Sequence, residues 1–289
     1  MSPISNHPLA KKTVIHPPFS LYSGIQAHFE SQRTTRIWDE LLGIQAEVTK
    51  NEDLKFFFNS QAFKSAKKVL DFGCGPGDLI RTLLAYFPDK QYTGVDLSSD
   101  YIEFAAQRFS EAENVEFICD DIFSYSKGSY DVVILRLVVQ HIKDNRKLLD
   151  KLKRILNPGG SVVVIDTMDS MKCFSHPVLE LSKMYKALQS KQKGERGSRN
   201  AICEIESYCG ELGYRLRSSY EMPVTAISEE EIKRMSKMFM FASEIVSRKF
   251  AVNVNQFELF RQLAHWQQQP GAYAQIGMKY LELTFLRTS

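Results

Sequence analysis

The sequence has 289 residues, of which 44% are hydrophobic and 25% are charged, a composition typical of globular proteins rather than disordered or fibrous ones. Its net charge of +3 is too balanced to require a nucleic acid or membrane partner. No apolar run reaches the roughly 18 residues that a membrane span needs, and residues 1–20 lack the apolar stretch of a secretory signal. The five cysteines are scattered and lack the paired spacing of a zinc site, so we expect a cytoplasmic protein without a bound metal.

The N-terminal part is predicted to be helical after a short tail. Residues 1–18 carry Pro, His and Lys without hydrophobic periodicity, which predicts a flexible tail. Between residues 19 and 63, apolar side chains such as Ile37 and Leu41 recur at helical spacing. We expect two or three helices here, which form a cap segment ahead of the main fold.

Residues 64–227 are predicted to form an α/β core. Amphipathic helical patterns alternate there with short apolar runs at 68–72, 91–96, 115–119, 130–135 and 161–166. Strands with nearly continuous apolar residues are typical of a parallel sheet that is covered on both faces. The pattern therefore predicts a mostly parallel sheet flanked by helices.

The C-terminal part is predicted to return to helix and to end in a strand. A strand at 214–224 precedes residues 228–270, which we expect to form a helical cap insertion with Met, Phe and Ile on one side. Residues 280–286 alternate enough to predict a final strand. This strand lies in a segment, 271–289, that we expect to complete the core sheet.

A glycine-rich turn, Asp-Phe-Gly-Cys-Gly-Pro-Gly at residues 71–77, stands between the first predicted strand and the following helix. Glycines let the backbone turn sharply and approach a ligand closely, and the helix behind them offers free N–H groups to an anion. A dinucleotide-binding turn needs a third glycine where this chain has Asp78, whose charge would face a pyrophosphate. The turn therefore disfavours a dinucleotide ligand.

Three further segments follow this turn in order. Asp96 ends the second predicted strand, where a carboxylate can accept hydrogen bonds from ribose hydroxyls. Asp120-Asp121-Ile122 follows the third strand, and Leu-Asn-Pro-Gly-Gly at 156–160 precedes the fifth. Together with the glycine-rich turn, these segments resemble the motifs of the class I, Rossmann-like S-adenosylmethionine (SAM)-dependent methyltransferases. The likeness is to the branch that acts on quinones and other small molecules, and it covers roughly residues 66–169.

The resemblance implies an enzyme, a SAM-dependent methyltransferase with SAM as its cofactor. It also implies a Rossmann-like, seven-stranded, mostly parallel sheet with one antiparallel strand and a helical cap. The residues that it places at the cofactor come from the glycine-rich turn, from the ends of the second and third strands, and from the end of the fourth strand: Asp71, Gly73, Cys74, Gly75, Gly77, Asp96, Leu97, Asp121, Ile122 and Arg136.

The segment 136–142 follows the fourth strand and, by the same resemblance, lies beside the transferred methyl group. It lacks the Asn/Asp-Pro-Pro-aromatic segment of enzymes that methylate nucleic acid amines, so we expect a small, partly apolar acceptor and no nucleic acid. His141 is a candidate general base, which favours O-methylation over C- or N-methylation. Alternatively, His141 only supports its loop. The other candidate acceptor contacts are Tyr22, Gln140, Met235 and Phe239.

Two alternative functions stay open at this point. Residues 183–199 carry six basic side chains and one acidic one. Such a run usually forms a solvated face, but it could also bind RNA or a peptide that is the methyl acceptor. The other alternative is a catalytically silent SAM-binding regulatory protein. The sequence predicts no particular oligomeric state.

Overall fold

The structure, a computed structural model, describes residues 19–192 and 197–286. The predicted tail at 1–18 lies outside the described residues. The strands are β1 (Lys68–Phe72), β2 (Gln91–Asp96), β3 (Val115–Cys119), β4 (Tyr130–Arg136), β5 (Leu156–Thr167), β6 (Cys173–Phe174), β7 (Tyr214–Ala226) and β8 (Ala274–Phe285). The helices are α1 (Phe19–Ser31), α2 (Thr34–Asn59), α3 (Gln61–Ser65), α4 (Asp78–Tyr86), α5 (Ser99–Arg108), α6 (Asn145–Leu152), α7 (Leu179–Gln192), α8 (Ala201–Tyr208), α9 (Glu229–Phe250) and α10 (Gln256–Gln267).

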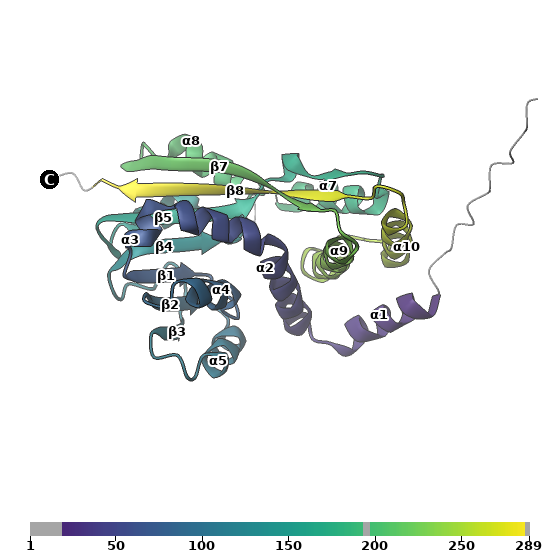
Figure 1. The fold of residues 1–289 in the computed structure, drawn as a ribbon, viewed down its shortest axis with the longest axis horizontal. Helices are drawn as coiled ribbons and strands as arrows, with labels where there is room; N and C mark the ends of the chain where they lie inside the picture. Colours follow the sequence, from purple (N-terminus) through teal and green to yellow (C-terminus); the bar gives the residue numbers. More distant parts are fainter. Residues whose placement is uncertain (1–18, 193–196, 287–289) are drawn as a thin grey trace, which may run out of the picture.

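The strands form one sheet in the order β3-β2-β1-β4-β5-β8, and both β6 and β7 pair with β8 (Figure 1). The first five strands are parallel, and β8 runs antiparallel to β5 and β7. The predicted α/β fold with a mostly parallel sheet is therefore confirmed, with β1 at the centre. Among the described residues the sheet has eight strands rather than the predicted seven. The extra strand, β6, has two residues, too few to show a hydrophobic period.

Alternate residues of the central strands pack into two separate cores. Val69, Val132 and Val163 point to the face covered by α2, α3 and α4, whereas Leu70 and Val133 point to the face covered by α6 and α8. All five side chains are fully buried. Because successive residues of a strand face opposite sides, burial on both faces accounts for the continuous apolar runs in the sequence.

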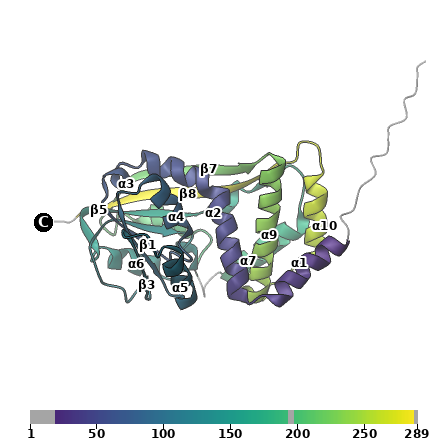
Figure 2. The same cartoon turned by 60° about the horizontal axis from the view of Figure 1, so that its bottom comes forward.

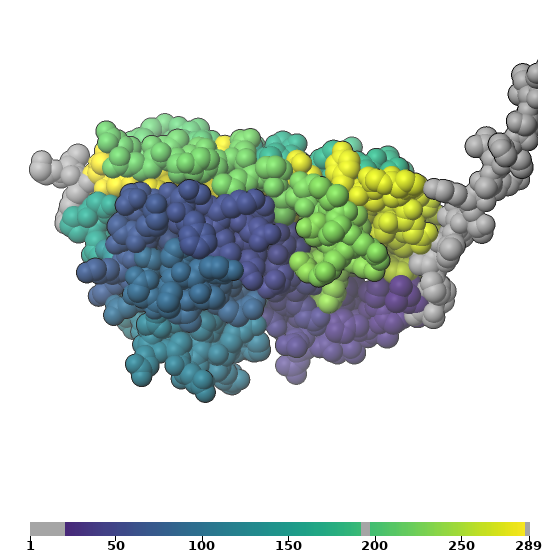
Figure 3. Space-filling model, viewed as in Figure 1, coloured from purple at the N-terminus to yellow at the C-terminus, as the bar shows by residue number. Residues whose placement is uncertain are grey.

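The helices that do not flank the parallel strands gather beyond one end of the sheet. Strands β7 and β8, of 13 and 12 residues, extend past the parallel core (Figure 1). The first part of α2 and helices α1, α7, α9 and α10 stand side by side at this end (Figure 2). Figure 3 shows the surface hollowed between the blue α4–α5 part and the purple α1–α2 part.

A buried network ties α2 to the sheet. At the end of β4, Arg136 Nε donates to Asp53 Oδ2 at 3.0 Å and its Nη2 donates to Thr49 Oγ1 at 2.6 Å. From β8, the Tyr280 hydroxyl donates to Asp53 Oδ1 at 2.8 Å. The Arg136 and Asp53 side chains are only 9% and 3% exposed. Each charge therefore needs the other to offset the cost of its removal from water.

We expect Asp53→Ala to lower the free energy of unfolding by about 3–5 kcal/mol, because it removes the carboxylate that pairs directly with the buried Arg136 guanidinium. Urea denaturation measures this loss. The control is Glu211→Ala, which removes the partner of Arg146 from an exposed pair at 2.8 Å and should cost less than about 1 kcal/mol. Equal, small losses in the two variants would contradict a structural role for the network.

Candidate active site

The glycine-rich turn forms a tight loop between β1 and α4. Gly73, Gly75 and Gly77 have φ angles of +79°, +53° and +82°, in the left-handed region that favours glycine. A Cβ on Gly73 would lie 2.5 Å from Cγ2 of Val138, so this glycine is also required for close packing. The loop therefore brings bare backbone to the carboxyl edge of the sheet, where a ligand can approach it.

Asp96 at the end of β2 supports this loop. Its Oδ2 accepts a hydrogen bond from the Gly75 N–H at 2.9 Å, and its Oδ1 accepts one from the Ser98 N–H at 2.9 Å. Each carboxylate oxygen keeps further acceptor capacity, because an ionised carboxylate offers about four lone-pair positions. Asp96 can therefore hold the loop and still accept from the hydroxyls of a ligand.

A cavity of about 750 Å³, which we call the glycine-loop cavity, opens in front of the loop. Its other walls come from α2 through Trp38, from α5 through Tyr101, and from the end of α9 through Lys249. The sequence-predicted residues that line it are Asp71, Gly73, Cys74, Gly75, Asp96, Arg136 and His141. The structure thus brings most of the predicted cofactor residues together.

Asp71 gives this cavity an acidic floor. Burial, opposed by the charge of Arg136 and assisted by the neighbouring Asp96, raises the pKa of its carboxyl to about 7. A cationic group of a ligand would stabilise the ionised carboxylate here. The amino group and sulfonium of SAM are cations of this kind, so the residues present fit the cofactor that the sequence implies.

Four predicted cofactor residues stand apart from the cavity lining. Gly77 caps the N-terminus of α4, and the Leu97 side chain is exposed. Asp121 makes a local turn, in which its Oδ1 accepts from the Phe123 N–H at 2.7 Å. Ile122 packs against the core on the α6 side of the sheet. Asp121 and Ile122 therefore stay proposed contacts of the cofactor.

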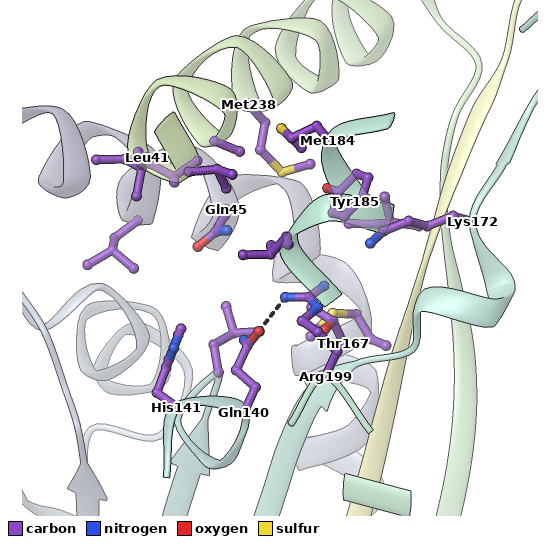
Figure 4. Close-up of a pocket in the computed structure, with 18 of the residues that line it drawn as sticks. Leu41, Gln45, Gln140, His141, Thr167, Lys172, Met184, Tyr185, Arg199 and Met238 are labelled. Atoms are coloured by element: carbon purple, nitrogen blue, oxygen red, sulfur yellow. Dashed lines mark hydrogen bonds between the residues drawn. The ribbon is translucent and has the colours of Figure 1, made fainter. Parts of the chain in front are cut away.

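A second cavity, of about 120 Å³, lies deeper in the molecule and is called the inner cavity here (Figure 4). It shares five lining residues with the glycine-loop cavity: Trp38, Leu42, Leu137, His141 and Phe250. Side chains of α2, α7 and α9 make its apolar walls, including Leu41, Met184 and Met238. Its polar lining includes Gln45, Thr49, Gln140, His141, Thr167, Lys172, Tyr185 and Arg199.

Two of the predicted acceptor contacts, Gln140 and His141, line the inner cavity, and three do not. Tyr22 packs instead against α10, with its ring centroid 5.1 Å from that of Phe257. Met235 and Phe239 are fully buried in the core, on a part of α9 that does not line the cavity. The lining residues of α9 are Met238, Ala242, Ile245, Val246 and Phe250. Met235 and Phe239 belong to the same helical face by their spacing, so periodicity alone does not show which residues of that face meet a cavity.

His141 stands where the two cavities meet. One side of its ring is open to the cavities, and Trp38 approaches it edge-on with 6.3 Å between the ring centroids. Loss of hydration, together with the positive charges of Arg199 and Lys249, lowers the pKa of His141 to about 4. The imidazole is therefore neutral at pH 7 and can accept a hydrogen bond from a group in either cavity.

Leu137 is a residue of this junction that gave no sequence signal. It lines both cavities and has a φ of +58°, an uncommon conformation for a leucine. Its N–H donates to the Ile165 carbonyl of β5 at 2.7 Å, which holds the turn in place. Backbone strain of this kind often occurs at functional sites. A glycine would have marked the position in the sequence, but leucine does not.

The basic run at 183–199 does not form a continuous cationic face. Lys183 pairs with Glu180 at 2.6 Å, and Lys191 Nζ donates to the Ala251 carbonyl at 2.7 Å. Arg199 is turned inward, where it pairs with Asp169 and donates to Gln140. Lys193 and Arg196 lie outside the described residues. The predicted solvated face is therefore wrong for Arg199, which the structure makes part of the inner cavity.

No group of three or more His, Cys, Asp or Glu side chains in the described part of the chain is arranged to hold a metal ion. None of the helices described is both long enough and apolar enough to cross a membrane.

Comparisons with known proteins match the core of the chain to methyltransferases. Residues 70–162 match a family model described as "Methyltransferase domain". The chain is 38% identical over 109 residues, 37% of its length, to a malonyl-[acyl-carrier protein] O-methyltransferase of Acetivibrio thermocellus. It is 27% identical over 169 residues, 57% of its length, to a demethylmenaquinone methyltransferase of Staphylococcus aureus. These alignments span 38% and 67% of the two relatives.

A solved structure from Bacillus halodurans, described as a candidate methyltransferase, superimposes with a TM-score of 0.52 at 18% sequence identity. The match covers 82% of this chain and all of that one, and it shows a shared fold. The family match, the two sequence relatives and this fold agree with the glycine loop and the strand order described above. The core of the chain, residues 70–162, is therefore similar to a methyltransferase domain, and the fold of the chain is Rossmann-like.

Proposed function

We propose that this protein transfers a methyl group from SAM in the glycine-loop cavity to a small, partly apolar acceptor in the inner cavity. The observation that carries the proposal is that the two cavities meet along one wall, formed by Trp38, Leu42, Leu137, His141 and Phe250. Methyl transfer is an in-line displacement, which requires the two reactants to lie end to end. A shared wall between a cofactor cavity and an enclosed cavity provides that arrangement.

In the glycine-loop cavity, Asp96 would accept hydrogen bonds from the ribose and Asp71 would face the cationic methionine part. SAM, when bound, supplies a methyl group on a positively charged sulfur. The chain itself binds and orients the two reactants and keeps water away, and these effects suffice for much of the rate enhancement of a displacement. The mostly apolar lining of the inner cavity favours a partly apolar acceptor.

We propose a positioning role for His141 toward the acceptor atom. A neutral imidazole at the junction can accept a hydrogen bond from an acceptor hydroxyl, which supports O-methylation over C- or N-methylation. A group whose pKa is about 4 is a weak base. We therefore assign to His141 the orientation of the acceptor hydroxyl rather than the removal of its proton.

The two alternatives have less support. In the basic run, Lys183 pairs with Glu180 and Arg199 is buried in a pair with Asp169, which reduces the charge that the run offers to a macromolecular acceptor. A silent SAM-binding protein would need no acceptor space beside its cofactor. In this protein the inner cavity adjoins the glycine-loop cavity, which favours an active enzyme.

We expect the protein to convert SAM to S-adenosylhomocysteine in the presence of a suitable member of a panel of small hydroxylated aromatic and aliphatic compounds. Product is measured by mass spectrometry. The rate should hold steady between about 50 and 200 mM salt, whereas an RNA acceptor with 6–10 phosphate contacts would lose roughly 10³–10⁵-fold in affinity. A steep salt dependence would support the macromolecular alternative, and a lack of product with every acceptor would support the silent one.

Gly73→Ala should weaken S-adenosylhomocysteine binding about tenfold or more, equivalent to roughly 1.4 kcal/mol, because the added methyl collides with Val138 and displaces the loop. Isothermal titration calorimetry measures the affinity. Gly159→Ala is a matched control, since Gly159 has a similar φ of +77° but open space around the added methyl. If both variants bind as the wild type does, the glycine loop is not the cofactor site.

His141→Ala should lower kcat about tenfold, short of the 10²–10⁴-fold typical of a lost general base. His141→Gln should recover part of this loss, because an amide oxygen can accept the same hydrogen bond. Steady-state kinetics of the two variants with one acceptor test the point. A loss of 10³-fold or more in both variants would show that His141 removes the proton.

A further inference from the structure

The polar end of the inner cavity is built around two cations that share one carboxylate. Arg199 binds Asp169 with two hydrogen bonds, from Nη2 at 2.6 Å and from Nε at 2.9 Å. Lys172 Nζ contacts the same carboxylate. The three side chains are only 13–14% exposed. Lys172 and Arg199 line the cavity and Asp169 does not, so the cations face the cavity and the carboxylate lies behind them.

A single carboxylate, that of Asp169, contacts both cations at this end of the cavity. The next acid is Asp166, whose carboxyl accepts from the backbone N–H groups of Gln140 and Thr167 at 3.1 and 2.7 Å and whose pKa is raised by burial to about 6. Burial and the charge of Arg199 lower the pKa of Lys172 to about 7. An added negative charge beside Lys172 would therefore favour its charged form.

Neutral hydrogen-bonding groups surround the same place. The Thr167 hydroxyl is buried and has no hydrogen-bond partner among residues 19–192 and 197–286. Burial raises the pKa of Tyr185 to about 12, so its hydroxyl remains a donor, and Lys172 Nζ lies 3.4 Å from the centre of its ring. A buried polar atom without a partner is costly, so the Thr167 hydroxyl indicates that a polar group of a ligand completes this end.

The opposite end of the cavity leads to the cofactor. Figure 4 shows His141 on one side of the cavity and Lys172 and Tyr185 on the other, with Met238 and Leu41 along the apolar wall. Because His141 also lines the glycine-loop cavity and Lys172 does not, an acceptor that spans the inner cavity has one end near the cofactor and one end near the two cations.

We infer that the methyl acceptor is a small carboxylate whose carboxyl group binds Lys172 and Arg199 while its methylated atom lies near His141. The inference rests on the proposed function and specifies its substrate class. The carboxylate is an anchor at the far end of the cavity and is not itself the methylated group. A planar carboxylate suits the guanidinium of Arg199 and the point charge of Lys172, and the hydroxyls of Thr167 and Tyr185 can donate to its remaining lone pairs.

The test compares hydroxylated monocarboxylates, the hydroxybenzoates and hydroxyphenylacetates, with their neutral carboxamides, using the full chain saturated with S-adenosylhomocysteine. Calorimetry should show that at least one carboxylate binds, about 10- to 100-fold more tightly than its amide, the range expected for charge-assisted hydrogen bonds. Equal binding of the acids and amides, or binding of neither, would overturn the inference.

Lys172→Met removes one cation but leaves the Arg199–Asp169 pair intact, so the variant should fold. It should bind the same carboxylate about 10- to 100-fold more weakly and the amide unchanged, while Lys172→Arg should keep most of the affinity for the acid. Lys183→Met is the matched control, because Lys183 is exposed on α7 and pairs with Glu180 away from the cavity. A Lys172→Met variant that still prefers the acid over the amide would contradict the inference.

A separate measurement distinguishes this inference from the proposed function. Wild-type protein that fails to bind S-adenosylhomocysteine would refute the proposed function itself. Intact S-adenosylhomocysteine binding in wild type and Lys172→Met, together with equal affinity for acids and amides, would refute the carboxylate anchor alone.

Discussion

The buried ion pair between Arg136 and Asp53 is the interaction on which the rest of the structure depends. It joins the end of β4 to the middle of α2, and Tyr280 extends the connection to β8. The same helix supplies Trp38 and Leu42, which belong to both cavities. Two buried charged groups tolerate little displacement, because separating them leaves each charge buried away from its partner. The pair therefore fixes α2 over the carboxyl edge of the sheet, and with it the common wall of the two cavities.

Carboxylates lie beside the glycine loop, and cations line the far end of the inner cavity. The glycine-loop cavity contains the carboxylates of Asp71 and Asp96, and the far end of the inner cavity contains Lys172 and Arg199. Between them lies a mostly apolar junction with the neutral His141. A cationic cofactor and an anionic acceptor, as we propose, would each meet complementary charge and would be oriented with their reactive ends toward the junction.

The sequence was sufficient to predict the parallel core, because strands buried on both faces leave a strong apolar signal. The strands at 68–72, 91–96 and 115–119 have the predicted limits. Strand β8 begins at Ala274 rather than at 280, since its first half pairs with β6 and β7 beyond the parallel core, and only tertiary pairing defines that extension. The predicted helical stretch 228–270 is divided into α9 and α10 near Ala251, where φ is +49°.

The cavity residues of the helices were harder to predict. Periodicity shows that α9 has an apolar face, but Met235 and Met238 look alike in sequence, and nothing in the basic run distinguishes the inward-turned Arg199 from its exposed neighbours.

A crystal structure of the protein with S-adenosylhomocysteine tests the central claim most directly. We expect electron density in front of Gly73 and Gly75. The ribose hydroxyls should donate to Asp96, and the sulfur should be directed toward His141 and the inner cavity. Density elsewhere in the molecule, or a sulfur directed away from the wall that the two cavities share, would contradict the central claim.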